Sequence, residues 1–129
     1  MRIIQPESLG KPRGYSNGIL APAGRILFVA GQIGWDRTRK LKEGLTAQFG
    51  QAIQNILEVV REAGGSPENI GRMTIYIKDK SDYQKRTKEI GEQYQQRMGK
   101  HFPAMSLIIV KDLLEEGALV EIEATAVIP

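Results

Sequence analysis

The 129-residue sequence contains no cysteine and only one histidine, His101. The absence of cysteine excludes disulfide bonds, thiolate nucleophiles and cysteine-ligated zinc sites. His101 lies in a segment that predicts a loop, and no motif supports it as the base of a Ser-His-Asp triad, so we interpret it as a surface residue. No P-loop, GxGxxG, HExxH or other metal-ligand spacing occurs, and we expect neither a metal nor a nucleotide cofactor.

Long hydrophobic runs are also missing from the sequence. Runs such as Leu107–Val110 are far too short to cross a bilayer, and the first six residues lack the apolar core of a secretory signal. We therefore expect a soluble, cytoplasmic protein with no membrane anchor. The length predicts one domain covering residues 1–129, which is large enough to build a core without disulfides.

Charge and aromatic content are both modest, with a net charge of +3 and 6% aromatic residues. Lys and Arg gather at residues 37–42 and 85–88, but acidic residues flank both groups. Such mixed segments are typical of solvated loops and helix faces, and no aromatic-rich RNA-binding strand is present. Nucleic acid is therefore an unfavoured partner.

Hydrophobic periodicity predicts an α+β fold. Arg25–Ile33 is apolar on both faces, which is typical of a central strand, and the turn residues around it favour Tyr15–Leu20 as its hairpin partner. Leu45–Ala63 carries one apolar stripe at helical spacing and ends at Gly64-Gly65, a common type of helix terminus.

The second half of the chain adds one helix and three strands. Arg72–Lys78 and Leu119–Ile128 alternate apolar with polar residues, and Met105–Val110 is a short apolar strand. A second helix, residues 81–98, begins with a capping-box pattern of a serine followed three residues later by a glutamine.

The predicted order is β-β-α-β-α-β-β, with two helices packed on one face of a single sheet. The other face would leave apolar side chains of the central strand in water, so it needs a cover. We therefore expect a homo-oligomer in which sheet faces or edges pack together.

Two carboxylates, Glu121 and Glu123, lie on one face of the last strand, because alternate residues of a strand share a face. At a buried interface each would need a partner, and such carboxylates suit general acid–base catalysis. An exposed polar face, or a salt bridge to Arg72 or Lys78, explains the same pattern more simply. Composition alone favours this second interpretation.

Four segments form a recognisable combination: Gly14–Asn17 (GYSN), Leu27–Ile33 (LFVAGQI), Phe102–Ser106 (FPAMS) and Gly117–Ala124 (GALVEIEA). Together they resemble the RidA/YjgF family, also known as the L-PSP endoribonuclease or reactive-intermediate deaminase family, over nearly the whole chain. The resemblance implies a chorismate-mutase-like α+β fold and a homotrimer with three clefts between subunits. Members hydrolyse enamine and imine intermediates, such as 2-aminoacrylate and 2-iminopropionate, to keto acids and ammonia without a cofactor. Others have been described as ribonucleases or translation inhibitors.

The resemblance also implies which residues form the site. Glu121 matches the carboxylate that positions the attacking water, and Thr87 aligns with an asparagine often found on the second helix. The other matching positions would line the cleft and bind the substrate: Tyr15, Ala30, Gly31 and Ser106.

One position departs from the family pattern. Where the family has Pro-Ala-Arg-Ser, this chain has Pro-Ala-Met-Ser, so Met105 replaces an arginine. A guanidinium holds a substrate carboxylate through two charge-assisted hydrogen bonds, and methionine offers neither donor nor charge. Losing both bonds costs about a hundredfold or more in binding. Met105 therefore argues against standard imino-acid deamination and favours a less anionic or more apolar ligand.

Three interpretations follow. The first is a RidA-like trimer that binds, or acts on, a small metabolite in its intersubunit clefts without the standard deaminase activity. The second is an active enamine/imine deaminase, a hydrolase of C=N bonds, in which another cation such as Arg13 or Lys111 replaces the arginine. The third, a ribonuclease or RNA-binding translation regulator, rests only on the family name and mild basicity, and we rank it last.

Overall fold

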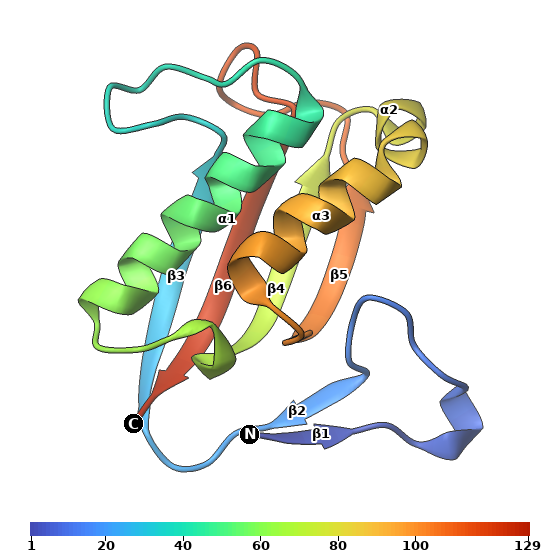
Figure 1. Cartoon of the computed structure of the whole chain (residues 1–129), viewed down its shortest axis with the longest axis vertical. Coiled ribbons are helices and arrows are strands. Elements are labelled where there is room, and N and C mark those ends of the chain that lie inside the picture. Colours follow the sequence, from blue (N-terminus) through green and yellow to red (C-terminus); the bar gives the residue numbers. More distant parts are fainter.

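The computed structural model describes all residues, 1–129. Its helices and strands follow in the order β1 (Arg2–Ile4), β2 (Gly18–Leu20), β3 (Arg25–Ile33), α1 (Leu45–Glu62), β4 (Ile70–Ile77), α2 (Lys80–Lys85), α3 (Thr87–Met98), β5 (Ala104–Ile109) and β6 (Val120–Ile128). Helices α1 and α3 lie side by side on one face of the main sheet (Figure 1). No helix combines the length and apolar character needed to cross a membrane.

The main sheet has four strands in the order β3-β6-β4-β5. Strand β6 pairs antiparallel with both β3 and β4, and β4 pairs in parallel with β5 through the α2–α3 crossover. The α+β class and the placement of two long helices on one sheet face confirm the prediction.

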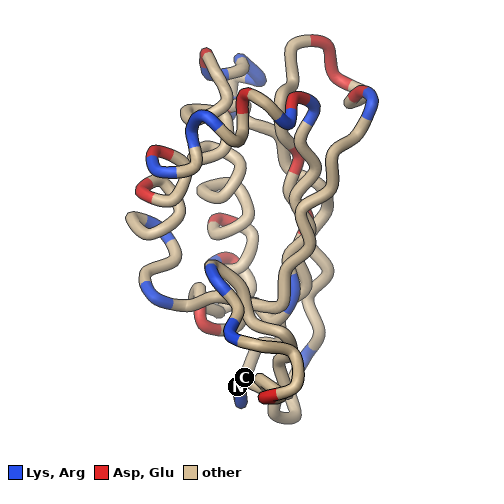
Figure 2. The backbone as a smooth tube through the Cα atoms, turned by 90° about the vertical axis from the view of Figure 1, so that its right-hand side faces the viewer, with Lys and Arg blue, Asp and Glu red and all other residues tan.

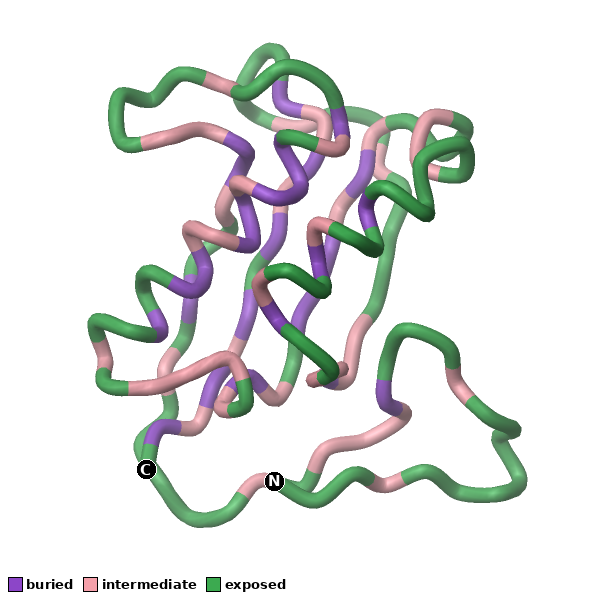
Figure 3. The backbone as a smooth tube through the Cα atoms, viewed as in Figure 1, coloured by how far each residue is buried: buried purple, intermediate pink, exposed green.

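The core lies between this sheet and the two helices. The apolar stripe of α1 is buried, and Figure 3 shows buried residues along the side of α1 that faces the sheet. Burying each large aliphatic side chain stabilises the fold by roughly 1.5–3 kcal/mol. The stripe meets inward-facing residues of β4 and β6, which include Met73, Ile75, Ile122 and Ala124.

The prediction that Tyr15–Leu20 forms a hairpin with β3 is wrong. Strand β2 pairs antiparallel with β1 in a separate two-stranded sheet, in which Ile3 lies opposite Ile19. Pro22 lies between β2 and β3 and has no amide hydrogen to donate, which disfavours a tight hairpin there. The partner strand β1 is only three residues long, too short for its alternation to be recognised.

The second predicted helix differs from the structure at its start and in its continuity. Asp79, not Ser81, is the N-cap, because the Asp79 carboxylate accepts a hydrogen bond from the Asp82 amide at 3.0 Å. Ser81 lies inside α2. Arg86 leaves helical geometry, with φ −117° and ψ 16°, and divides the segment into α2 and α3.

Candidate functional site

The sheet face opposite the helices is uncovered in the single chain. Strand alternation and the observed register place Glu121 and Glu123 of β6 on this face, opposite Tyr76 and Thr74 of β4. Phe28 of β3 lies on the same face and is 78% exposed. This face therefore combines carboxylates with large exposed apolar side chains.

Glu123 and Glu121 have different surroundings on this face. The Tyr76 hydroxyl donates to Glu123 at 2.8 Å, and this bond raises the pKa of Tyr76. Glu121 makes no hydrogen bond or ion pair within the chain. Lys78 pairs with Asp112 instead, at 3.0 Å, so the predicted salt bridge from Arg72 or Lys78 to a strand carboxylate is wrong.

A β-bulge brings the backbone of β3 against Glu121. The register shifts between Val29 and Gln32, so that Ala30 and Gly31 together lie opposite one residue of β6. A Cβ atom added at Gly31 would overlap the Glu121 carboxylate. Only glycine therefore allows the carboxylate to lie against the strand at this point.

Glu121 opens into a hollow of about 580 Å³, which we call the Glu121 hollow; its lining includes Gly31, Trp35, Arg37, Arg39, Asn55 and Glu121. The Arg39 guanidinium lies 5.2 Å from the Trp35 ring centroid, a cation–π distance. Arg39 also has a left-handed φ of 63°, which costs on the order of 1 kcal/mol in a residue with a side chain.

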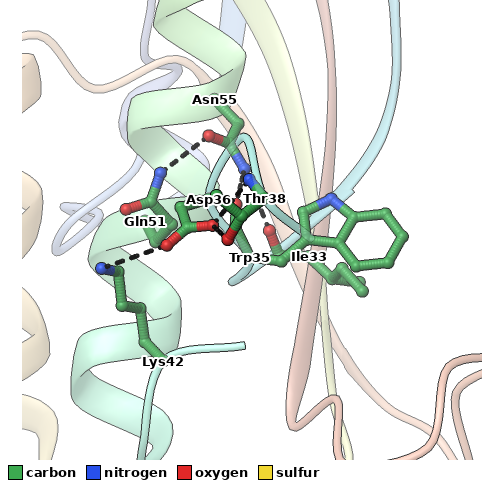
Figure 4. Close-up of polar contacts among 7 residues, drawn as sticks. All are labelled: Ile33, Trp35, Asp36, Thr38, Lys42, Gln51 and Asn55. Carbon is green, nitrogen blue, oxygen red and sulfur yellow. Dashed lines mark hydrogen bonds and ion pairs between the residues drawn. The ribbon is translucent and has the colours of Figure 1, made fainter. Parts of the chain in front are cut away.

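Helix α1 holds the loop that forms one wall of the Glu121 hollow (Figure 4). The Asn55 amide donates to the carbonyl oxygens of Ile33 and Trp35 at 3.2 and 2.9 Å. Gln51 donates to the Asn55 side-chain oxygen at 2.9 Å, which fixes the orientation of the Asn55 amide. These bonds position the chain immediately after the bulge.

The same loop is stabilised around Asp36. The hydroxyl and the amide of Thr38 donate to the Asp36 carboxylate at 2.5 and 2.8 Å, and Lys42 lies 3.8 Å from it (Figure 4). These hydrogen bonds, with the positive charge of Lys42, hold the pKa of Asp36 below its ordinary value. Ionised Asp36 therefore stabilises the conformation of this loop.

Gln48 is a buried side chain that sequence reasoning missed. Its amide nitrogen donates to the carbonyl oxygens of Lys42 and Gly117, both at 3.1 Å, and its oxygen accepts from the Leu119 amide at 2.8 Å. It therefore ties together the two loops that flank the Glu121 hollow. The available signal was its place on the apolar stripe of α1, three residues after Leu45.

A second hollow, of about 510 Å³, lies between α3, β5 and the segment before β2. We call it the Met105 hollow; its lining includes Arg13, Tyr15, Tyr83, Thr87, Met105 and Leu107. The structure thus brings together Tyr15, Thr87 and Met105, three of the residues that the resemblance singled out. Arg13 lines the same hollow, whereas Lys111 does not.

Buried Ser16 fixes Tyr15 beside β5. The Ser16 amide and hydroxyl donate to the carbonyl oxygens of Pro103 and Phe102 at 3.0 and 2.5 Å. Ser16 also forms an isolated parallel bridge with Ala104, the first residue of β5. Tyr15 therefore approaches the start of the strand that carries Met105.

Two tyrosines in the wall of the Met105 hollow keep their hydroxyl protons. Burial raises the pKa of Tyr83 and, more strongly, that of Tyr94. The Tyr94 hydroxyl donates to the His101 carbonyl at 2.6 Å, whereas the Tyr83 hydroxyl has no partner within the chain. Half-buried His101 is also structural, because its ring Nε2 lies 2.7 Å from the Ile70 carbonyl oxygen.

The predicted site residues divide into two groups within one chain. Met105 lies on the helix side of β5 and Ser106 on the opposite face, but both line a third hollow of about 200 Å³, together with Tyr15 and Arg72. Glu121 and Gly31 line the Glu121 hollow, with Ala30 beside them in the bulge. The two groups share no cavity. No group of three or more His, Asp or Glu side chains could hold a metal ion.

Comparison with known proteins places this geometry in a family. The Endoribonuclease L-PSP family matches residues 6–128. A RutC family protein of Pyrococcus horikoshii is 35% identical over 96% of this chain and 95% of its own length. The human 2-iminobutanoate/2-iminopropanoate deaminase is 30% identical over 88% of this chain and 79% of its own length.

Solved structures agree with the sequence matches. The crystal structure of YyfB, a Rid family protein of Yersinia pestis, superposes with a TM-score of 0.88 at 33% identity, covering 98% of both chains. The sequence match over residues 6–128 and the shared fold establish that the chain belongs to the L-PSP endoribonuclease family, that of the RidA/YjgF proteins.

Proposed function

We propose that the protein is a RidA-like homotrimer that acts on a small enamine or imine in clefts between its subunits. In this arrangement the Glu121 hollow of one subunit faces the Met105 hollow of the next. Two observations support it: the site residues of one chain lie in separate hollows, and the uncovered sheet face exposes 78% of Phe28. A face of this kind needs a partner in water.

The reaction that best suits this site is hydrolysis of a C=N bond, as the name of the human relative indicates. Water adds to the imine carbon while Glu121 accepts a proton from it. The proton then passes to nitrogen, which gives a carbinolamine. Transfer of its hydroxyl proton to nitrogen as the C–N bond breaks releases ammonia and leaves a carbonyl group. The observation that carries this proposal is the unpaired Glu121 carboxylate lying against the backbone of Gly31.

Met105 restricts the substrate. A small imino acid such as 2-iminopropionate has little besides its carboxylate by which it can be held, and a thioether cannot pair with that group. We therefore propose that the standard deaminase activity toward such substrates is lost in this chain.

Ammonia release from freshly generated 2-iminopropionate tests both parts of the proposal. We expect the wild type to be inactive, Met105→Arg to be active, and the double variant Met105→Arg/Glu121→Gln to be inactive again. Full activity of the wild type would refute the loss of standard deamination. Inactive Met105→Arg with a native fold would refute the assigned chemistry.

A second candidate is a deaminase in which another cation holds the carboxylate. The observation in its favour is that Arg13 lines the same hollow as Met105. No comparable observation favours a ribonuclease, since His101 is bonded to the Ile70 carbonyl and both charge signs occur on α1 and α3 (Figure 2).

A further inference from the structure

The segment between β1 and β2 forms a loop at the end of the molecule where β5 begins (Figure 1). Ile4 of β1 pairs with Gly18 of β2, which brings the two ends of this loop together. Inside that pair, the backbone amide of Asn17 donates to the Gln5 side-chain oxygen at 2.8 Å. Compact surface loops with closed ends frequently form functional sites. We call residues 5–17 the N-terminal loop.

Two prolines and two glycines set the shape of the N-terminal loop. Pro6 and Pro12 each have a fixed φ, which reduces the freedom that the loop would lose on binding a ligand. Gly10 and Gly14 turn the chain with positive φ values of 72° and 74°. Buried Ser16 then anchors the loop, because its amide and hydroxyl donate to the residues just before β5. The loop is therefore held against the start of β5 before any ligand binds.

A hollow of about 670 Å³ lies between the N-terminal loop and the chain that leads into β5. We call it the loop hollow; its lining includes Pro6, Lys11, Pro12, Lys100, His101 and Phe102. Its volume falls within the range of small-molecule sites. It shares only Gly14, Tyr15 and Phe102 with the Met105 hollow, so the two hollows are separate cavities with a short stretch of common wall.

The apolar surface of the loop hollow comes from Pro6, Pro12 and the rings of Tyr15 and Phe102. The Phe102 ring is fixed, because it stacks on the ring of Tyr94 with centroids 5.5 Å apart. Aromatic rings pack favourably against other rings in stacked or edge-to-face arrangements. The loop hollow therefore suits a ligand with a planar apolar body.

The charged groups of the loop hollow are mainly positive. Lys11 and Lys100 are exposed and form no ion pair or hydrogen bond within the chain, and Glu7 is the single carboxylate in the lining. No arginine lines this hollow, so it lacks the planar fork that pairs with a carboxylate. A phosphate monoester carries nearly two negative charges at neutral pH and a carboxylate only one, so two ammonium groups attract the phosphate more strongly.

His101 adds a further polar group to the loop hollow. Its Nε2 lies 2.7 Å from the Ile70 carbonyl oxygen, and we assign a hydrogen to Nε2 because a carbonyl oxygen only accepts. Nδ1 makes no hydrogen bond within the chain and is the ring nitrogen left for a ligand. It can accept from a P–OH group or, when the ring is protonated, donate to a phosphate oxygen.

We propose that the loop hollow binds a small phosphate monoester with a planar apolar body. Lys11, Lys100 and the free ring nitrogen of His101 hold the phosphate. The body packs between the prolines of the N-terminal loop and the rings of Tyr15 and Phe102. This site is separate from the clefts of the proposed function, and it stands whether or not the protein hydrolyses imines.

Calorimetric titration of the intact protein with phenyl phosphate, inorganic phosphate and benzoate tests this inference. We expect phenyl phosphate to bind at least about 10-fold more tightly than inorganic phosphate, because its ring leaves water. Benzoate has the same ring but a single negative charge, and it should bind about 10-fold less tightly than phenyl phosphate. Similar affinities for phenyl phosphate and inorganic phosphate would overturn the inference, as would failure of phenyl phosphate to bind.

Three lysine variants locate the bound phosphate. Lys11→Gln and Lys100→Gln should each weaken the binding of phenyl phosphate by about 10-fold, the effect of losing one charge-assisted interaction. The matched control is Lys88→Gln, which removes an exposed cation from the lining of the Met105 hollow and should leave the affinity unchanged. Unchanged binding in both Lys11→Gln and Lys100→Gln would overturn the inference. Weakening in Lys88→Gln alone would place the probe in the Met105 hollow and would overturn it as well.

Discussion

The Glu121 hollow and the Met105 hollow belong to one chain but are built in different ways. Around Glu121, hydrogen bonds from Asn55 and Gln48 fix the backbone, and a glycine bulge presses the strand against the carboxylate. The Met105 hollow is shaped by apolar side chains, and its cations have no partner within the chain. The difference indicates that the backbone around Glu121 is fixed by polar contacts, while the side chains that line the Met105 hollow are open to change.

The largest loss of activity should come from a variant that cannot assemble, because assembly would bring the Glu121 hollow of one subunit against the Met105 hollow of the next. Phe28→Glu places a charge on the uncovered sheet face, and burying a charge without a partner strongly disfavours assembly. In the Met105→Arg background, we expect a folded monomer whose ammonia release from 2-iminopropionate falls to background. Sedimentation velocity, circular dichroism and the ammonia assay measure the three properties.

The control for this variant is Val59→Glu, which changes an exposed apolar residue on α1, away from the uncovered face. It should remain oligomeric and active. A Phe28→Glu monomer with full activity would contradict the proposal that the site needs both hollows from different subunits.

An intermediate loss of activity is expected from a substitution in the β-bulge of β3. Gly31→Ala introduces a methyl group where the Glu121 carboxylate lies, so the carboxylate must move. Displacing a catalytic group by about 1 Å costs about 100-fold in rate. In the Met105→Arg background, ammonia release from 2-iminopropionate should fall by about that factor.

Gly71→Ala is the matched strand control, because its added Cβ would make only ordinary contacts with Met1 and Ile19. If Gly31→Ala retained full ammonia release, the contact between Gly31 and Glu121 would have no part in the reaction.

The smallest effect should be a pH-dependent loss of stability in a variant of Asp36, whose loop forms one wall of the Glu121 hollow. Hydrogen bonds from Thr38 and the charge of Lys42 lower the pKa of Asp36 below its ordinary value of 3.8. Ionised Asp36 therefore stabilises the native loop fully above about that pH, and this stabilisation is lost as pH falls through the lower native pKa. Asp36→Asn should be less stable than wild type at neutral pH, and the difference should vanish in acid.

Urea unfolding at a series of pH values measures this difference. Glu116→Gln, at an exposed residue that makes no ion pair, should match wild type at every pH. A difference between Asp36→Asn and wild type that persisted unchanged below the native pKa would show that the hydrogen bonds do not depend on the ionised carboxylate.

Much of the fold could be predicted because its long elements carry long patterns. The apolar stripe of α1 and the alternation of apolar and polar residues in β6 each extend over many residues. The sequence therefore predicts both the type of each element and the face that it buries. Strand β1 has three residues and no such pattern. Asp79 and Ser81 are both good cap residues, and only the three-dimensional contact with the Asp82 amide decides between them.

The candidate site was predictable as a set of residues but not as an arrangement. The resemblance identified Gly31, Glu121 and Met105, yet it could not show that a single chain keeps the first two apart from the third. Nor could it choose between Arg13 and Lys111 as a cation near Met105. That choice depends on the anchoring of Ser16 beside β5, a contact between residues far apart in the sequence.

The contact between Gly31 and Glu121 also bears on how this scaffold can evolve. A side chain at position 31 would overlap the Glu121 carboxylate where it now lies, so mutations there require the carboxylate to move. Position 105 opens into a hollow of about 510 Å³ and accepts residues of several sizes. New substrate ranges can therefore arise through changes at the Met105 wall, while the Glu121 side, to which we assign the proposed hydrolysis, stays unaltered.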